Sequence, residues 1–207
     1  MSRRLSVTEA GDVLATGLVV ALPTDTVYGL AAYWEDSRAV STIFDLKQRP
    51  SDVALPVLVA SPDQILETGA AWPEEADRLA KIFWPGALTI ATPAPEELAR
   101  RVGARSTVGW RQPANRATLD LLARSGPLAV TSANRHGEAP ARSAEEVLEI
   151  FAGTSLAGVL DGGRCGGQVS TVIELVGAEW RVRRVGGVPP ELIEEILGPP
   201  LDETPAR

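Results

Sequence analysis

The chain has 207 residues, 44% of them hydrophobic and 23% charged, and its formal net charge at pH 7 is −7. This composition is typical of a soluble globular protein, and the acidic balance argues against a broad nucleic-acid-binding face, although a local basic groove is compatible with it. One cysteine, Cys165, and one histidine, His136, exclude an internal disulfide framework and argue against a zinc site.

No Pro-, Gly- or Ser-rich linker and no shift of composition divides the chain, so we predict a single domain over residues 1–207. Its motif-bearing core covers about residues 7–187, and a C-terminal helix and tail cover residues 188–207. No apolar run approaches the length of a membrane span, and no apolar stretch follows the first residues as in a secretory signal. We therefore expect a cytoplasmic protein with no membrane contact.

The first predicted helix is Val7–Ala15, where apolar residues recur at helical spacing, and a strand follows over Leu18–Leu22. That strand is an unbroken apolar run, typical of burial on both faces, and the proline after it cannot donate to a sheet. Thr24, Asp25 and Thr26 come next. Strand ends of this kind are common ligand sites in open α/β sheets, and the alternative is that Thr24 or Asp25 only caps a short helix.

A second predicted helix, Ser37–Leu46, delivers Lys47 and Arg49 at its C-terminal end. Cations there interact favourably with the helix dipole, so a purely structural role is one interpretation of both residues. The chain has eighteen arginines but only two lysines, Lys47 and Lys81. A lysine kept beside Arg49 therefore suggests a site residue, although Lys81 lies in an ordinary predicted helix.

The remaining predicted elements alternate between strands and helices. The strands are Leu55–Val59, Ala87–Thr92, Thr107–Arg111 and Leu128–Thr131, with a closing hairpin of Ser170–Val176 and Trp180–Val185. The helices are Pro62–Thr68, Pro73–Phe83, Ala117–Arg124, Ser143–Phe151 and Pro189–Leu197. The segment Pro93–Ser106 has no clear periodicity, and we predict a loop there, either a flexible one over the site or a solvated one.

Several of these strands run into polar or small residues. Alternation along Thr107–Arg111 puts Thr107 and Arg111 on one face, where the arginine can bind a carboxylate bidentately. Ser132 and Asn134 follow the next strand, although residues of these types are also common in plain turns. Hydroxyls, an amide and cations, without an evident catalytic thiol or imidazole, suit the binding of anionic and polar ligands better than covalent nucleophilic catalysis.

Seven short motifs occur along the chain. They are PTDTVYGL (23–30), KQR (47–49), FWPGALT (83–89), RQP (111–113), SAN (132–134), STV (170–172) and RRVGG (183–187). In this order they resemble the YrdC/Sua5 family, the L-threonylcarbamoyladenylate synthases that begin the threonylcarbamoyl modification of adenosine 37 in tRNA. The likeness covers roughly Leu18–Gly187, which is most of the chain.

The resemblance implies an α/β fold of the three-layer, α+β type, in which a twisted mixed sheet carries helices on both faces and the motif strands line one concave cleft. It also implies a nucleotidyltransferase reaction. The amine of L-threonine captures bicarbonate or CO2, and the carbamate formed then attacks the α-phosphorus of ATP and releases pyrophosphate. ATP is a substrate in this scheme, Mg²⁺ enters with the nucleotide, and the protein supplies positioning and charge neutralisation.

By the same resemblance, each role falls on a matching position of this chain. The catalytic candidates are Lys47 and Arg49. The candidates for binding L-threonine are Thr26, Arg111, Ser132 and Ser170. The candidates for binding ATP are Arg49, Thr107, Asn134, Arg142 and Arg184. Asn115 stands where the family motif R-x-P-x-H usually has its histidine, so the role of that histidine is not carried over.

Two alternatives remain open at this point. A carbamoyl-adenylating relative would use products of carbamoyl phosphate in place of threonine, but such domains are normally embedded in longer chains. A binding module for structured RNA belongs to another class, and the acidic net charge weighs against it, leaving at most weak RNA binding. For the main interpretation the expected partner is the downstream tRNA threonylcarbamoyltransferase complex, and the chain is expected to be the short form without a second domain.

Overall fold

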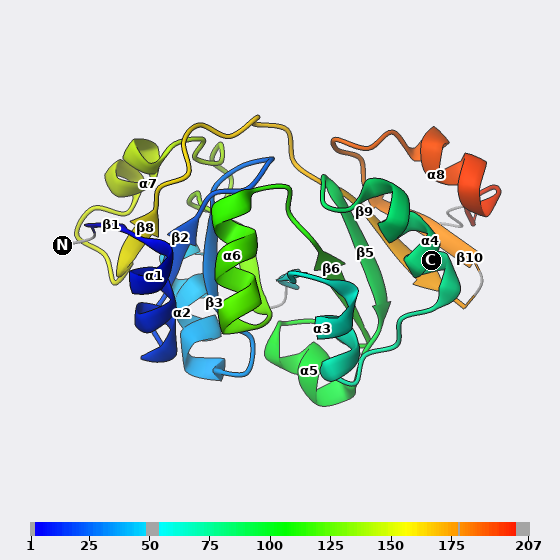
Figure 1. The fold of residues 1–207 in the computed structure, drawn as a ribbon, viewed down its shortest axis with the longest axis horizontal. Coiled ribbons are helices and arrows are strands. Elements are labelled where there is room, and N and C mark those ends of the chain that lie inside the picture. The colour runs from blue at the N-terminus through cyan, green and yellow to red at the C-terminus, as the bar shows by residue number, and fades with distance from the viewer. Residues whose placement is uncertain (1–2, 49–53, 178, 202–207) are drawn as a thin grey trace.

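The computed structural model describes residues 3–48, 54–177 and 179–201. Within these residues, ten strands form one mixed sheet in the order β1-β8-β2-β3-β7-β4-β6-β5-β9-β10 (Figure 1). The strands are β1 (Arg3–Leu5), β2 (Val20–Leu22), β3 (Gly29–Tyr33), β4 (Val57–Leu58), β5 (Leu88–Pro93), β6 (Thr107–Arg111), β7 (Leu128–Ser132), β8 (Gly158–Leu160), β9 (Thr171–Val176) and β10 (Glu179–Arg184). The helices are α1 (Val7–Ala15), α2 (Ser37–Lys47), α3 (Pro62–Glu67), α4 (Glu74–Phe83), α5 (Glu96–Arg101), α6 (Arg116–Ser125), α7 (Ala144–Ile150) and α8 (Pro190–Leu197).

Side chains alternate across the central strands, and this alternation gives the sheet two buried faces. Leu22 and Val130 belong to a cluster with Leu14 of α1, on the face that α1 and α6 cover. Leu30 of β3 points to the other face and belongs to a larger cluster with Val40 of α2. Figure 1 shows α1 and α6 together in front of β2 and β3. The predicted architecture, a mixed sheet with helices on both faces, is confirmed.

The predicted helices and strands are present, and their ends lie within one or two residues of the expected positions. The strand predicted from Leu18 begins at Val20, because Leu18 is 48% exposed and lies before the buried part of the run. The hairpin of β9 and β10 is antiparallel, as predicted. Periodicity therefore located most of the longer elements, although β3, which is as long as β6, was not predicted.

The loop predicted over Pro93–Ser106 is wrong in part, because α5 forms inside this segment. Leu98 and Ala99 of α5 are buried in the larger core, and acidic residues begin the helix while arginines end it. This charge order complements the helix dipole, and a Glu97–Arg101 ion pair lies along the helix. The six residues of α5 show no clear helical period, whereas the equally short α3 was predicted with the help of the proline in its first turn.

A segment of ten residues, 161–170, joins β8 to β9 and is called the crossing segment below. Figure 1 shows it running along the upper edge of the molecule, from the strands near the N-terminus to the β9–β10 hairpin. Hydrogen bonds tie it to the turn after β2: the Tyr28 hydroxyl donates to Gly163 O at 2.9 Å and accepts from Gly162 N at 3.2 Å, and Gly167 N donates to Thr26 O at 2.6 Å. The crossing segment therefore holds that turn in place from above.

Candidate active site

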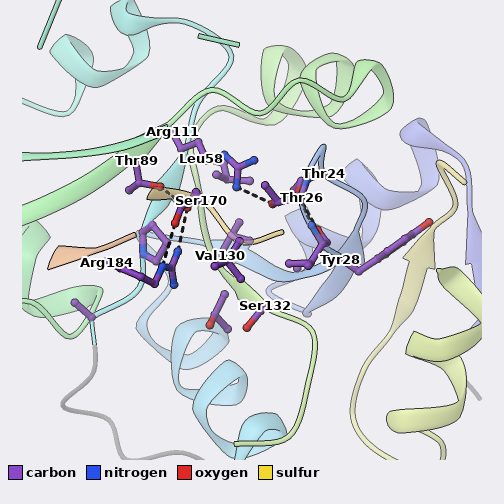
Figure 2. A pocket seen from close by; sticks show the side chains of 16 residues that line it. Thr24, Thr26, Tyr28, Leu58, Thr89, Arg111, Val130, Ser132, Ser170 and Arg184 are labelled. Carbon is purple, nitrogen blue, oxygen red and sulfur yellow. Dashed lines mark hydrogen bonds between the residues drawn. The ribbon is translucent and has the colours of Figure 1, made fainter. Parts of the chain in front are cut away.

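A cavity of about 160 Å³ has strand ends around it, and its apolar lining includes Leu58 and Val130. Its polar lining residues are Thr24, Thr26, Thr89, Arg111, Thr131, Ser132, Ser170 and Arg184. In Figure 2, Thr24 and Thr26 lie on one side and Ser170 and Arg184 on the other. Arg111, Ser132 and Arg184 are the last residues of β6, β7 and β10. Ser170 comes directly before β9.

Thr24 organises the turn that presents Thr26. The Thr24 hydroxyl donates to Val27 O at 2.6 Å and accepts from the backbone N–H groups of Thr26 and Val27. Because its proton is used in this way, the 2.8 Å contact between the two threonine hydroxyls has Thr26 as donor. Thr24 thus has a local structural role, and the oxygen of Thr26 is left to accept from Arg111.

Arg111 is buried, with 6% of its surface exposed, and its guanidinium makes three directed contacts. It donates to Gly86 O at 2.8 Å, to the Thr26 hydroxyl at 2.9 Å and to the Asp25 carboxylate at 2.7 Å. Burial lowers the pKa of Arg111, the Asp25 carboxylate raises it, and the positive charge of Arg184 lowers it. Two guanidiniums near one small cavity make this a site for an anion such as a carboxylate.

Ser170 lies on the opposite wall, between Arg184 and Thr89. Arg184 donates through Nη2 to the Ser170 hydroxyl at 3.0 Å and through Nε to Ser170 O at 3.0 Å. The hydroxyls of Ser170 and Thr89 are 2.9 Å apart (Figure 2). Thr89 was not predicted as a site residue. It is the last residue of the FWPGALT motif, and this position could have indicated its role.

A second cavity, of about 360 Å³, adjoins the first, because Ala54, Pro56, Thr89 and Arg184 line both. Leu55, Ala91, Gly109 and Val172 give it apolar lining, and Thr107, Glu174 and Arg183 add polar groups. The Thr107 hydroxyl donates to Glu174 Oε1 at 2.8 Å. Thr107 and Arg111 were predicted to share a strand face, and they line these two neighbouring cavities.

Lys47 and Asn134 lie behind the first cavity and are not among the residues that line either one. The Lys47 side chain is 2% exposed and turns inward from the last turn of α2. Its ammonium donates to Ser132 O at 2.6 Å and to Asn134 O and Oδ1, both at 3.0 Å. Lys47 therefore lies in the last turn of α2, as expected, but its side chain points into the protein and holds Ser132 and Asn134.

Of the other predicted ligands of ATP, Arg142 lines neither cavity, and Arg49 is not among the described residues. Arg142 is exposed and donates to Gly166 O in the crossing segment at 3.1 Å. Asn115, at the position where the family usually has histidine, caps α6 by accepting from Thr118 N at 3.2 Å.

The described residues contain no obvious group for nucleophilic or metal-centred chemistry. Cys165 is buried in the crossing segment, and burial raises the pKa of its thiol, which keeps it in the unreactive protonated form. Among residues 3–48, 54–177 and 179–201, no three His, Cys, Asp or Glu side chains come together as a metal site. None of the described helices is long and apolar enough to cross a membrane.

Comparison with known proteins agrees with this geometry. The model of the Sua5, YciO and YrdC family, described as "Telomere recombination", matches residues 12–186. A threonylcarbamoyl-AMP synthase of Pyrococcus abyssi is 42% identical over 194 residues, covering 91% of this chain and 56% of the relative. The enzyme of the same name from Bacillus subtilis is 40% identical over 197 residues, covering 93% of this chain and 57% of the relative.

The structural comparison points in the same direction. A crystal structure of P. abyssi Sua5 complexed with L-threonine has a TM-score of 0.87 and 39% identity, and the match covers 96% of this chain and 60% of that one. This chain thus spans a little over half the length of these relatives. The matched residues, the shared fold and the seven motifs together show that the chain belongs to the Sua5/YciO/YrdC family.

Proposed function

We propose that this protein is an L-threonylcarbamoyladenylate synthase, a nucleotidyltransferase that condenses L-threonine, bicarbonate or CO2, and ATP to threonylcarbamoyl-AMP and pyrophosphate. The observation that carries the proposal is the pair of adjoining cavities. One is small and has a buried arginine and hydroxyls in its lining, and the other is larger with a lining that is partly apolar. Relatives named threonylcarbamoyl-AMP synthase, and a relative's complex with L-threonine, support it.

The small cavity suits the amino acid. In our proposal Arg111 binds the carboxylate, because a guanidinium held by Gly86 and Asp25 is oriented before the ligand arrives. Thr26, Ser132 and Ser170 line the same cavity and supply oxygens for the two remaining polar groups of threonine, its amine and its hydroxyl. Positioning of this kind removes the entropic cost of bringing the reactants together.

The larger cavity suits the nucleotide. Thr107 and Arg184 line it, and the apolar residues Leu55, Ala91 and Val172 offer contacts for a purine ring. Arg142 and Arg49 are proposed as further ligands of the phosphates, and Mg²⁺ arrives as part of the ATP substrate. Arg184 lines both cavities, so it neutralises charge where a carbamate oxygen meets the α-phosphorus.

The wider setting follows from this activity. We propose that residues 1–207 act as one cytoplasmic domain with ATP, L-threonine and bicarbonate as substrates. The product, an unstable mixed anhydride, requires an acceptor enzyme, and the proposed consumer is the complex that transfers the threonylcarbamoyl group to tRNA. RNA binding by this protein itself is at most weak, because its net charge is −7.

The test is release of pyrophosphate by the purified protein with ATP and Mg²⁺, leaving out each substrate in turn. We expect release only when L-threonine and bicarbonate are both present. Release with carbamoyl phosphate in the absence of threonine would assign the protein to carbamoyl adenylation instead. Tight, saturable RNA binding without any adenylate product would reject the synthase assignment in favour of a binding module.

A further inference from the structure

Backbone and side-chain oxygens hold the ammonium of Lys47 behind the small cavity. Among the described residues, three oxygens accept from it: Ser132 O at 2.6 Å, Asn134 O at 3.0 Å and Asn134 Oδ1 at 3.0 Å. Because Lys47 is 2% exposed and lines neither cavity, its ammonium reaches a bound ligand only through the residues that it holds.

The side-chain amide of Asn134 is fully engaged. Its oxygen accepts from Lys47 Nζ at 3.0 Å and from the Ser132 hydroxyl at 2.6 Å. Its nitrogen donates to Arg135 O at 2.7 Å and to Glu138 O at 2.9 Å. A flipped amide would set an NH₂ group against the ammonium of Lys47, two donors facing each other. Lys47 and the carbonyls of Arg135 and Glu138 together fix which end of the amide faces Ser132.

The orientation of the amide decides what Ser132 offers to a ligand. A serine hydroxyl has one proton, and here that proton goes to Asn134 Oδ1. Ser132 lines the small cavity, so toward the cavity its oxygen acts only as an acceptor. An acceptor selects an N–H group of the ligand and disfavours a carboxylate oxygen at the same place.

We propose that Lys47 is a positioning residue, which acts through Asn134 to make Ser132 an obligate acceptor for the amine of the bound amino acid. This inference rests on the proposed function. With the carboxylate at Arg111, an amine N–H donated to Ser132 leaves the nitrogen lone pair free. That pair forms the N–C bond to CO2, a C=O electron pair moves onto oxygen, and the proton released from nitrogen passes to water.

The proposal changes two roles that the family resemblance implies. Lys47 does not touch the carbamate or the phosphates, and the Asn134 side chain, with all four of its hydrogen-bonding positions used within the protein, does not bind the nucleotide. Loss of either residue should then affect recognition of the amine and leave ATP binding intact. A direct contact with substrate predicts the opposite division.

The test compares two ligands in the absence of ATP, L-threonine and (R)-3-hydroxybutanoate, which has the same skeleton with hydrogen in place of the amine. Calorimetry gives the affinity of each for the wild type and for Lys47→Met, Asn134→Ala and Ser132→Ala. We expect the wild type to prefer threonine by about tenfold or more, as for one well-placed hydrogen bond in a shielded site. In all three variants this preference should fall to a similar low value.

The two affinities separate the possible roles. A merely structural effect lowers both affinities together and leaves their ratio unchanged, and that result would overturn the proposal. So would a large loss of ATP affinity in Asn134→Ala, or a further fall of the ratio when Lys47→Met is added to Ser132→Ala. If Lys47→Met does not fold, as judged by circular dichroism, Asn134→Ala tests the same chain of contacts.

The other lysine of the chain, Lys81, provides a control, and threonine binding by the wild type tests the proposed function on which this inference rests. Lys81→Met removes the chain's other lysine, which is exposed on α4 and pairs with Asp77, and it should change neither affinity. If the wild type binds no threonine, the proposed function fails and this inference fails with it. If the wild type binds threonine and forms the adenylate while the ratio stays constant in the variants, only the inference fails.

Discussion

Arg111 places a full positive charge in a nearly buried position, and Asp25 at 2.7 Å neutralises only one edge of it. We predict that Arg111→Ala weakens L-threonine binding by about 100- to 1,000-fold, because a charge-assisted, bidentate contact in a shielded site is lost. ATP affinity should change little. Titration calorimetry with each ligand separately measures both values.

The control for Arg111 is Arg116→Ala, which removes an exposed arginine paired with Asp120 on the outside of α6. It should leave both affinities unchanged. An equal loss of threonine and ATP affinity in Arg111→Ala would show that the residue supports the fold or the nucleotide. Thermal unfolding of the same samples identifies a general loss of structure.

Tyr28 is fully buried, and burial raises its pKa from 10.0 to about 12. The folded state therefore keeps the phenol proton at a pH where the unfolded chain has lost it, so stability falls as pH rises from about 10 to about 12. The expected loss is about 2–3 kcal/mol from this residue. Below pH 10 the residue adds no pH dependence.

The measurement is denaturant unfolding of the wild type and of Tyr28→Phe between pH 8 and pH 12. The phenylalanine variant loses the hydrogen bond to Gly163 O but has no phenol to ionise, so its curve should fall less steeply above pH 10. Parallel curves for the two proteins would contradict the prediction.

The residues of the site were predictable to different degrees. Strand alternation and a short motif were enough to predict Thr107 and Arg111 as site residues, because both patterns involve only residues that are near in sequence. The engagement of Lys47 was not predictable, since its acceptors lie on Ser132 and Asn134, more than eighty residues away in sequence. A helix-end lysine looks the same in sequence whether it points to solvent or into the core.

Among the elements, the crossing segment depends on a backbone conformation that only glycine adopts easily. Gly167 has φ of +92°, and a Cβ there would lie 2.6 Å from Arg142 Nε. We predict that Gly167→Ala lowers the free energy of unfolding by about 1–2 kcal/mol through backbone strain and also weakens ATP binding, because Arg142 must move.

Gly163 offers a matched control in the same segment. Its φ is +80°, but a Cβ there would meet nothing within 4 Å. Gly163→Ala should therefore cost similar stability in denaturant unfolding and leave ATP affinity unchanged. The same ATP affinity in both variants would argue against a role for Arg142 in nucleotide binding.

Element prediction succeeded where a period had room to repeat. The nine residues of α1 and the five of β6 show their periods plainly. The short strands β1 and β8, with three residues each, were not predicted, and neither were α5 and the five-residue strand β3. A strand of three residues is too short to show the two-residue alternation twice. Only their pairing with strands distant in sequence defines β1 and β8.

Across the whole molecule, distant parts of the chain interleave in one sheet. β8 pairs with both β1 and β2, and β9 pairs with β5. No cut through the sequence leaves two parts with complete sheets, so we predict one cooperative unfolding transition. Tryptophan fluorescence, which reports the buried Trp110 and Trp180, should change together with far-ultraviolet circular dichroism. Separate transitions for the two signals would indicate two folding units.

Because β8 lies between β1 and β2, this part of the sheet cannot be completed during translation until β8 has been made. Both early strands have left the ribosome long before β8 is made, because well over a hundred residues separate β2 from β8. At roughly 5–20 residues per second, the nascent chain waits on the order of 10 s with those strand edges unpaired. This wait makes the nascent protein a client for chaperones, and a slower stretch of codons between the two strands would prolong its exposure.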